Sequence, residues 1–198
     1  PARNDSFGSL ATAPKDKYHM SRFIVQGGNT LAGEVSVSGS KNSALAVLSA
    51  AILGSSPCEI ENVPDILDVR NFLKILEFLG ARVKFADHRV SVDPQGVQSR
   101  AMPADLASRL RGSILLAGPL LTRFGRTTLV RPGGDAIGKR PIDVHLEGFR
   151  KLGAEVKENE TIEITGELRG ATIVLPVSSV TGTENLIMAA CMARGDTE

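Results

Sequence analysis

The sequence predicts a mixed α/β (α+β) fold made of repeated units, because two kinds of segment recur along the chain at nearly constant spacing. Three short apolar segments rich in small residues occupy positions 41–54, 111–125 and 184–196. Their starts, Lys41, Arg111 and Glu184, follow one another after 70 and 73 positions. Two amphipathic segments, 68–85 and 143–158, also match each other. This spacing indicates two full units and an incomplete third.

Each unit is expected to form a helix, a strand, a second helix and two further strands. The second helix has apolar residues at helical spacing and ends at a glycine, Gly80 or Gly153, in the position after the C-cap. β-Branched and alternating stretches predict the strands, which are CEIENV, ARVKF and HRVSVD in the first unit and RTTLVRP, AEVKE and TIEITG in the second. A third unit begins with ATIVLP and its first helix, then stops at DTE. We therefore expect a fragment of a longer protein rather than a capped, atypical last repeat.

The N-terminal region has a different character. Residues 1–19 lack periodicity and have no apolar segment typical of a secretory signal, so we interpret them as a disordered extension or expression remnant. Residues 20–40 open with the strand pattern SRFIVQGG, and 41–198 are expected to form one domain, truncated in its third repeat. An unpaired strand at FIVQ would expose an edge and favour association or swapping.

Composition excludes several classes of function. The net charge of +1, the absence of Trp and the single Tyr argue against a nucleic-acid binder. The longest apolar stretch, ALAVLSAAILG, is too short to cross a bilayer. Cys58 and Cys191 lie in apolar surroundings and are predicted to be buried, reduced thiols of a cytosolic protein. No CxxC motif or histidine cluster suggests a metal site.

The starts of the recurring apolar helices predict an anion site. They read SGSKN, RLRGS and VTGTEN, and small or hydroxyl residues at a helix start leave backbone N–H groups available for an anion. If the units are related by rotation, Lys41, Arg111 and the amides of 181–183 converge. Taken singly, each start is equally an ordinary N-cap beside a solvated cation. SGSKN does not match the P-loop pattern, so ATP is not implied.

The stretch 131–141, RPGGDAIGKRP, places Asp135 among Arg131, Lys139 and Arg140. Glycine, proline and charge are ordinary loop residues. They also permit close backbone approach and hinge motion, so the loop could act as a lid that carries an acid or base. The surrounding cations favour the ionised form of Asp135.

Two motifs, SGSKNSALAVL and RPGGDAIGKRPIDVHL, resemble those of the UDP-N-acetylglucosamine 1-carboxyvinyltransferases, which are enolpyruvyl transferases. The resemblance covers about residues 21–197, including IENVPDILDV, RLRGSILLAGPLL, FRKLGAEV and SVTGTENLIMAA. The related 5-enolpyruvylshikimate-3-phosphate synthases share a GSKS-type motif but lack the GGxxIGxRPxDxH loop. The family fold implied is two inside-out α/β barrels, each of three βαβαββ units with helices inside and sheets outside. Residues 20–40 would then be strands leading in from a missing C-terminal domain, which holds the family's catalytic aspartate.

The resemblance implies transfer of the enolpyruvyl group of phosphoenolpyruvate to the 3′-hydroxyl of UDP-N-acetylglucosamine. This is the first committed, cytoplasmic step of peptidoglycan precursor synthesis and needs no cofactor. Lys41 and Asn42 would bind phosphoenolpyruvate and support the charge of the intermediate, with Lys41 as a catalytic residue beside Asp135. Arg111 and Arg140 would hold the phosphate. The residues implied near the nucleotide or its diphosphate are Pro141, Asp143, His145, Ser179, Val180 and Thr181. Thr181 replaces a glycine that many relatives have.

Most relatives carry cysteine where this sequence has Asp135. An aspartate can still donate the proton, but it is a far poorer nucleophile than a thiolate. The resemblance therefore implies resistance to the epoxide fosfomycin, and the nearby cations imply a lower pH optimum. Three alternatives stay open: a shikimate-pathway transferase, a non-catalytic nucleotide-sugar binding module, and a repeat scaffold without a ligand. No nucleic-acid or membrane partner is expected.

Overall fold

The computed structural model describes residues 24–28, 30–108, 110–130 and 142–198. The chain divides into two units, residues 1–36 and 37–198. The described residues of the first unit form neither helix nor strand, and Ile24 and Val25 are exposed. The strand expected from SRFIVQGG is therefore absent from those residues, since a strand requires a hydrogen-bonded neighbour and none of the described residues pairs with them. The assignment of 20–40 to a second domain stays a prediction.

The second unit contains the helices and strands of the described chain. In chain order they are α1 (Lys41–Ala50), β1 (Cys58–Ile60), α2 (Leu67–Leu79), β2 (Arg82–Ala86), β3 (Arg89–Asp93), α3 (Ala104–Ala107), the 3-10 helix η1 (Arg111–Leu116), α4 (Ala117–Phe124), β4 (Arg126–Val130), α5 (Asp143–Lys151), β5 (Glu155–Glu158), β6 (Thr161–Thr165) and α6 (Val180–Ala190). The order helix, strand, helix, strand, strand occurs twice, as predicted, with the short helix α3 as an addition that the sequence pattern did not indicate.

Sheet topology confirms the repeat. The strands form two antiparallel three-stranded sheets with the orders β1-β3-β2 and β4-β6-β5. In the first sheet Val92 on the central strand lies opposite Cys58 and Val83. In the second, Ile164 on the central strand lies opposite Thr127 and Val156. The last strand of each unit thus lies between the two earlier ones in both sheets.

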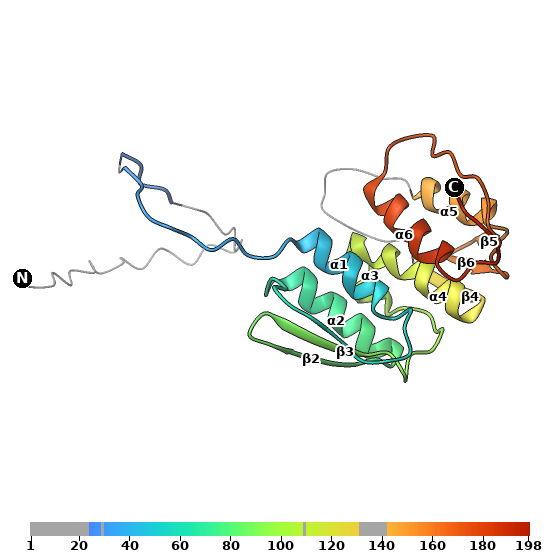
Figure 1. The fold of residues 1–198 in the computed structure, drawn as a ribbon, viewed down its shortest axis with the longest axis horizontal. Coiled ribbons are helices and arrows are strands. Elements are labelled where there is room, and N and C mark those ends of the chain that lie inside the picture. The colour runs from blue at the N-terminus through green and yellow to red at the C-terminus, as the bar shows by residue number, and fades with distance from the viewer. Residues whose placement is uncertain (1–23, 29, 109, 131–141) are drawn as a thin grey trace, which may run out of the picture. The chain divides into compact units, whose positions relative to one another are not determined.

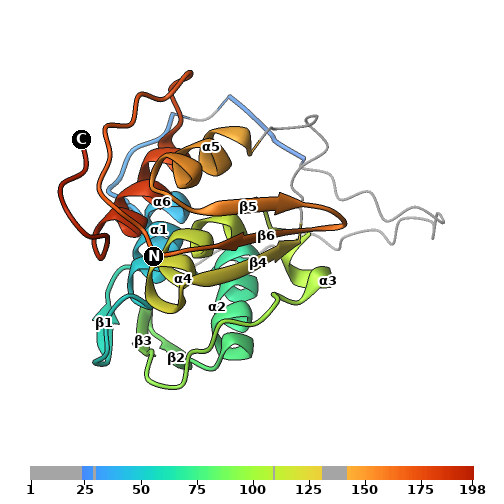
Figure 2. The same cartoon turned by 90° about the vertical axis from the view of Figure 1, so that its right-hand side faces the viewer.

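The helices lie between the two sheets, with the sheets at the periphery (Figures 1 and 2). Each central strand buries alternate residues, Val90 and Val92 in one sheet and Ile162 and Ile164 in the other, because side chains alternate between the two faces of a strand. Helix α1 contacts η1 and α6, and α4 contacts α6, so the first helices of the three units pack on one another. This confirms helices inside and sheets outside.

Both amphipathic helices end in the same backbone turn. Gly80 after α2 and Gly153 after α5 have φ angles of 106° and 95°. The amide of Ala81 donates to the carbonyl of Leu76 at 3.0 Å, and Ala154 donates to Phe149 at 3.0 Å. This hydrogen bond is typical of a Schellman motif, in which glycine adopts the left-handed conformation without steric cost. The predicted glycine stops are confirmed at equivalent positions of the two units.

The described residues of the third unit contain one helix, α6, and no strand. The ATIVLP segment (171–176) is not a strand; instead the 168–173 and 194–198 segments exchange backbone hydrogen bonds around a parallel bridge between Arg169 and Arg194. A single bridge is too short to count as a strand. The segments flank α6, so the structure contains the start of a parallel β-α-β arrangement.

Cys191 corrects a second prediction. Both cysteines are free thiols, but Cys191 is exposed and Cys58 is only partly buried. Cys191 caps the C-terminus of α6 on the side that also exposes Ile187, one turn earlier. The surrounding apolar sequence indicated a core position, but this side of the helix packs against no described element. Burial raises the pKa of the Cys58 thiol above its usual value.

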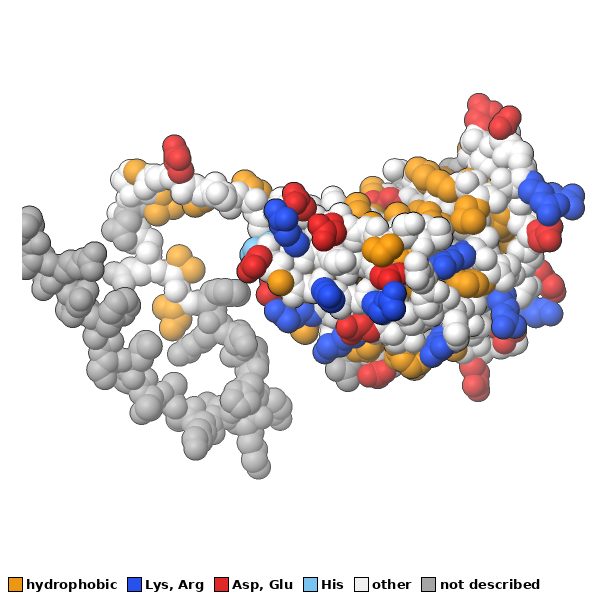
Figure 3. All heavy atoms as spheres, turned by 60° about the horizontal axis from the view of Figure 1, so that its bottom comes forward, with side chains coloured by type: hydrophobic (Ala, Val, Ile, Leu, Met, Phe, Trp, Pro, Cys, Tyr) orange, Lys and Arg blue, Asp and Glu red, His pale blue; other side chains and the backbone are white. Residues whose placement is uncertain are grey.

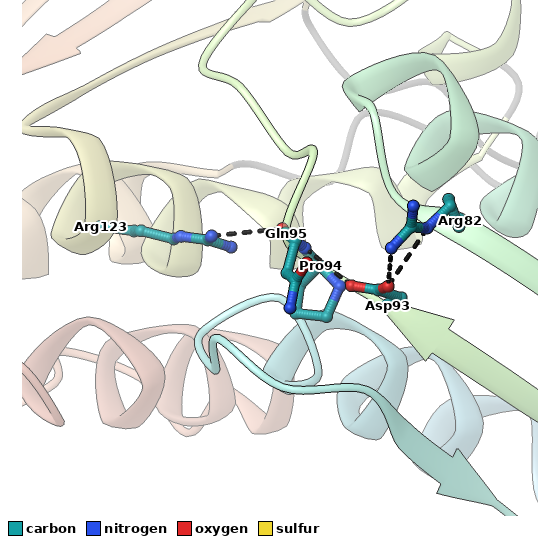
Figure 4. Close-up of polar contacts among 5 residues, drawn as sticks. All are labelled: Arg82, Asp93, Pro94, Gln95 and Arg123. Atoms are coloured by element: carbon teal, nitrogen blue, oxygen red, sulfur yellow. Dashed lines mark hydrogen bonds and ion pairs between the residues drawn. The ribbon is translucent and has the colours of Figure 1, made fainter.

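One partly buried arginine joins the two repeats that contain sheets. Arg123 in the last turn of α4 donates to the carbonyl of Ile52 at 2.7 Å. It also donates to the carbonyl of Pro94 at 3.2 Å (Figure 4). These two bonds tie the repeat that contains α4 to two loops of the repeat that contains α2. Next to this contact Arg82 is paired with Asp93, which keeps the pKa of that carboxyl below its usual value. On the face seen in Figure 3, basic and acidic side chains are interspersed.

Within the described ranges, the structure has no helix that is both long and apolar enough to cross a membrane. The same residues contain no group of three or more His, Cys, Asp and Glu side chains arranged to hold a metal ion.

Candidate functional site

The first helices of the repeats begin at the same end of the second unit. Helices α1 and α6 both start on the left in Figure 1. Ser40 caps α1, where its hydroxyl accepts from the amide of Ser43 at 3.5 Å, and Ser179 caps α6, where its hydroxyl accepts from Gly182 at 3.1 Å. The start of a helix carries partial positive charge, and its first backbone N–H groups have no carbonyl partner within the helix. Ser40 is a cap of the kind expected from SGSKN, whereas Ser179 immediately precedes the expected start VTGTEN.

Lys41 lies in the first turn of α1 and is ion-paired with Asp68. Its ammonium is 2.8 Å from the carboxylate of Asp68, in the first turn of α2. Both side chains are more than a third exposed, so this pair is weak and open to exchange with a ligand anion. Asn42, the next predicted residue, is exposed. The sequence did not mark Asp68 as a site residue, because acidic residues are common in the first turn of a helix.

His145 lies at the centre of a buried polar network. Its side chain is 1% exposed, although it belongs to the first turn of α5, two residues after the surface residue Asp143. Nδ1 is 3.0 Å from Nδ2 of Asn185 on α6. Nε2 is 3.5 Å from the hydroxyl oxygen of Thr181 at the start of the same helix. The network therefore joins His145 directly to Thr181, both predicted as ligand contacts, and also to Asn185, which was not predicted.

The ring of His145 is held neutral. Burial, and then the positive charge of Arg111, lower its pKa to about 4 from the ordinary value of 6.5. This electrostatic effect places Arg111, the first residue of η1, close to His145. Arg111, His145 and Thr181 thus lie near one another on three different elements. The expected convergence also included Lys41, and it stays a prediction.

An open hollow of about 290 Å³ lies at the start of α6, lined by Ser178, Ser179, Val180, Thr183 and Glu184. Partial burial raises the pKa of the Glu184 carboxyl. The helix start offers backbone amides and hydroxyls, with a guanidinium close by, and these are groups that bind oxyanions. No thiol or imidazole in this described cluster is arranged as a nucleophile beside a base.

The remaining predicted residues differ in how far the structure describes them. Asp135, Arg140 and Pro141 lie outside the described residues. Val180 is 71% exposed and its amide belongs to the first turn of α6. The residue missed by the sequence argument is Asn185, and a signal for it existed: an amide in the apolar run NLIMAA, one turn after Thr181, is a candidate for a buried hydrogen-bonding role.

The buried His145 predicts a loss of stability in acid. Below pH 6.5 the unfolded chain binds a proton at this residue that the folded chain does not bind until about pH 4. Its contribution to the free energy of unfolding is therefore present above pH 6.5 and falls by about 3 kcal/mol on going down to pH 4. Urea denaturation at several pH values measures this, with His145→Gln as the control, in which the slope over this window should be smaller. Equal slopes in the two proteins would contradict the prediction.

The architecture is that of enolpyruvyl transferases. The structure resembles the enolpyruvyl transferase NikO of Streptomyces tendae, with a TM-score of 0.73 and 25% identity over 86% of this chain and 41% of that one. It also resembles EPSP synthase of Acinetobacter baumannii, with a TM-score of 0.67 and 19% identity over 83% of this chain and 39% of that one, a level that shows the fold alone. The chain belongs to the EPSP synthase (3-phosphoshikimate 1-carboxyvinyltransferase) family, whose model matches residues 25–198.

Relatives with higher sequence identity to this chain are named UDP-N-acetylglucosamine 1-carboxyvinyltransferase rather than EPSP synthase. UDP-N-acetylglucosamine 1-carboxyvinyltransferase 3 of Caldanaerobacter subterraneus subsp. tengcongensis is 47% identical over 180 residues. The UDP-N-acetylglucosamine 1-carboxyvinyltransferase of Desulfatibacillum aliphaticivorans is 46% identical over 180 residues. In both comparisons the match covers 90% of this chain and 43% of the relative. The chain thus spans less than half the length of these curated relatives.

Proposed function

We propose that this protein transfers the enolpyruvyl group of phosphoenolpyruvate to the 3′-hydroxyl of UDP-N-acetylglucosamine and releases phosphate. The observation that carries the proposal is the 44–47% identity to proteins named for this activity, over 89–90% of the chain. In this reading the protein acts in the cytoplasm, in peptidoglycan precursor synthesis, and this chain supplies the part of the site that holds the sugar nucleotide.

The chemistry requires a proton donor and a cluster of positive charge. Protonation of C3 of phosphoenolpyruvate makes C2 electrophilic, the sugar hydroxyl attacks C2, and loss of a proton and of phosphate from the tetrahedral ketal regenerates the enol ether. Asp135 is proposed as the acid. Lys41 and Asn42 are proposed to bind phosphoenolpyruvate, with Arg111 and Arg140 on its phosphate, because fixed cations stabilise charge that develops on the reacting oxygens.

The sugar nucleotide is proposed to lie at the starts of α5 and α6. Its contacts would be Pro141, Asp143 and His145 on one side, and the amides and hydroxyls of Ser179, Val180 and Thr181 on its diphosphate. The cluster of Arg111, His145 and Thr181 and the hollow at the start of α6 support this placement. The exchangeable pair of Lys41 and Asp68 supports a role of the lysine in binding an incoming anion.

Calorimetric titration of the chain with UDP-N-acetylglucosamine and, separately, with shikimate 3-phosphate tests the proposal. The second ligand is included because the matching family model is named for the shikimate enzyme. We expect heat of binding with the UDP-sugar alone. Binding of shikimate 3-phosphate alone would assign the chain to the shikimate reaction. Binding of neither would contradict the claim that this chain holds the sugar nucleotide.

A second prediction concerns inactivation by fosfomycin and depends on the aspartate at position 135. The active protein is expected to keep its activity during incubation with fosfomycin, because a carboxylate opens the epoxide far more slowly than a thiolate. The Asp135→Cys variant is expected to be inactivated, with an adduct on the new thiol. Residual transferase activity against time, and peptide mass spectrometry, measure both. Rapid inactivation of the parent protein with an adduct on Asp135 would contradict the prediction.

A further inference from the structure

The buried side chain of Asn185 has its orientation set by two backbone groups. Its Oδ1 accepts from the amide of Gly118 at 2.7 Å, and its Nδ2 donates to the carbonyl of Ile114 at 2.8 Å. A backbone N–H can only donate and a backbone carbonyl can only accept, so the two ends of the carboxamide cannot be exchanged. Asn185 is completely buried, and an exchanged amide would leave both backbone groups unsatisfied at considerable cost.

This orientation determines which nitrogen of His145 carries the proton. The second hydrogen of Asn185 Nδ2 faces His145 Nδ1 across 3.0 Å. Nδ1 must therefore supply a lone pair, and a neutral imidazole then has its single proton on Nε2. A proton on Nδ1 would place two N–H groups against each other in a buried site. The choice of tautomer thus follows from the backbone of η1 and α4 through one amide.

The same argument extends one step further, to the start of α6. The Nε2–H group of His145 faces the hydroxyl oxygen of Thr181 across a long 3.5 Å contact. A hydroxyl that accepts from the ring has its own hydrogen directed to another acceptor. Thr181 lies in the first turn of α6, between Val180 and Gly182 and beside the hollow at that helix start. Its hydroxyl is then a donor for a ligand oxygen rather than an acceptor.

We propose that Asn185 is a positioning residue that fixes the Nε2–H tautomer of His145 and, through it, makes the Thr181 hydroxyl a hydrogen-bond donor to a phosphate oxygen of a nucleoside diphosphate. The nature of the ligand rests on the proposed function, whereas the tautomer does not. Thr181 and His145 would contact or orient the ligand, and Asn185 acts through them without touching it.

The first test is ¹⁵N NMR of the histidine side chains in the unmodified chain at pH 7. The signals of His145 are identified by their loss in His145→Gln. We expect Nε2 to show the shift of a protonated nitrogen and Nδ1 that of an unprotonated one. A protonated Nδ1 in the unmodified chain would overturn the inference, whatever ligand the protein binds and whether or not any variant folds.

The variant Asn185→Asp tests whether Asn185 determines the tautomer of His145. The two side chains have nearly the same shape, and the aspartate can still accept from the amide of Gly118, but a carboxylate offers no hydrogen to Nδ1. We expect a proton on Nδ1 in this variant. Thr183→Val is the matched control for the tautomer, because Thr183 lies two residues before Asn185 on the same helix and its hydroxyl donates to the carbonyl of Ser179 at 2.9 Å instead. An unchanged tautomer in Asn185→Asp, with native circular dichroism, would overturn the role of Asn185.

Calorimetric titration with UDP tests the effect on binding. Loss of one hydrogen bond corresponds to an affinity about five- to tenfold lower, which we expect for Thr181→Val and for Asn185→Asp. The double variant should bind no more weakly than either single variant, because both changes remove the same donor. Additive losses, or an unchanged affinity in Thr181→Val, would overturn the inference. If the unmodified chain bound no UDP, the proposed function and the ligand assignment would fail together, while the NMR result would still decide the tautomer.

Discussion

Gly118→Ala is expected to lower the free energy of unfolding by about 3 kcal/mol or more, because the added methyl group would overlap the backbone of α6. A Cβ at this position of α4 would lie 2.3 Å from the backbone oxygen of Asn185, 2.7 Å from its side-chain oxygen and 3.3 Å from the amide of Ala189. Two of these atoms belong to the backbone of α6 and cannot turn away. The two helices would have to separate and would strain the hydrogen bond between Gly118 and Asn185.

Gly54→Ala is the matched control. Its added Cβ would approach no atom closer than 4.0 Å, so we expect a change within about 0.5 kcal/mol. Urea denaturation followed by circular dichroism measures both variants. Similar midpoints for the two variants would mean that α4 and α6 do not pack as closely as the structure shows.

Arg111→Ala is expected to have the largest effect on ligand binding. Hydrogen bonds to charged groups are worth about 1.5–3 kcal/mol, so the affinity for phosphoenolpyruvate, whose phosphate Arg111 is proposed to hold, should fall about tenfold to a hundredfold. The same change should raise the pKa of His145 from about 4, because the charge of Arg111 is the second cause of its depression. Burial is the first cause and persists, so the pKa should stay below 6.5.

Calorimetry measures the affinity, and NMR titration of the ring measures the pKa. Arg126→Ala is the control, since this arginine is exposed at the start of β4 on the outer sheet. Its removal should change neither quantity. An Arg111→Ala variant that kept both its affinity and the His145 pKa would exclude Arg111 from the site.

Much of the fold could be predicted because it depends on local and periodic features. Helix starts and stops follow from Ser40, Ser179, Gly80 and Gly153, whose effects are confined to a few neighbouring residues. The repeat is visible because equivalent positions in two units face equivalent environments. The strand expected from SRFIVQGG is absent from the described residues of that stretch because a strand depends on its partner segment, which local propensity does not contain.

The candidate site was predictable only in part. The resemblance drew attention to His145 and Thr181 and not to Asn185, although Asn185 lies within the quoted stretch SVTGTENLIMAA. Nothing local marks Asp68 as the partner of Lys41, 27 positions away. Ion pairs and hydrogen bonds between distant segments are decided by which helices pack together. Cys191 shows the opposite error, since an apolar sequence around a residue does not say which side of the helix is covered.

The sequence by itself determined the repeated α/β architecture, the capping of the helices and the family of enolpyruvyl transferases to which the chain belongs. Periodicity, caps and motifs are properties of short stretches of sequence, so they can be recognised without knowing which segments pack together. Tertiary structure alone decided the neutrality of His145, which requires burial and the charge of Arg111. It also decided the direction of the hydrogen bonds through Asn185, since these depend on backbone groups 67 and 71 positions away in the sequence.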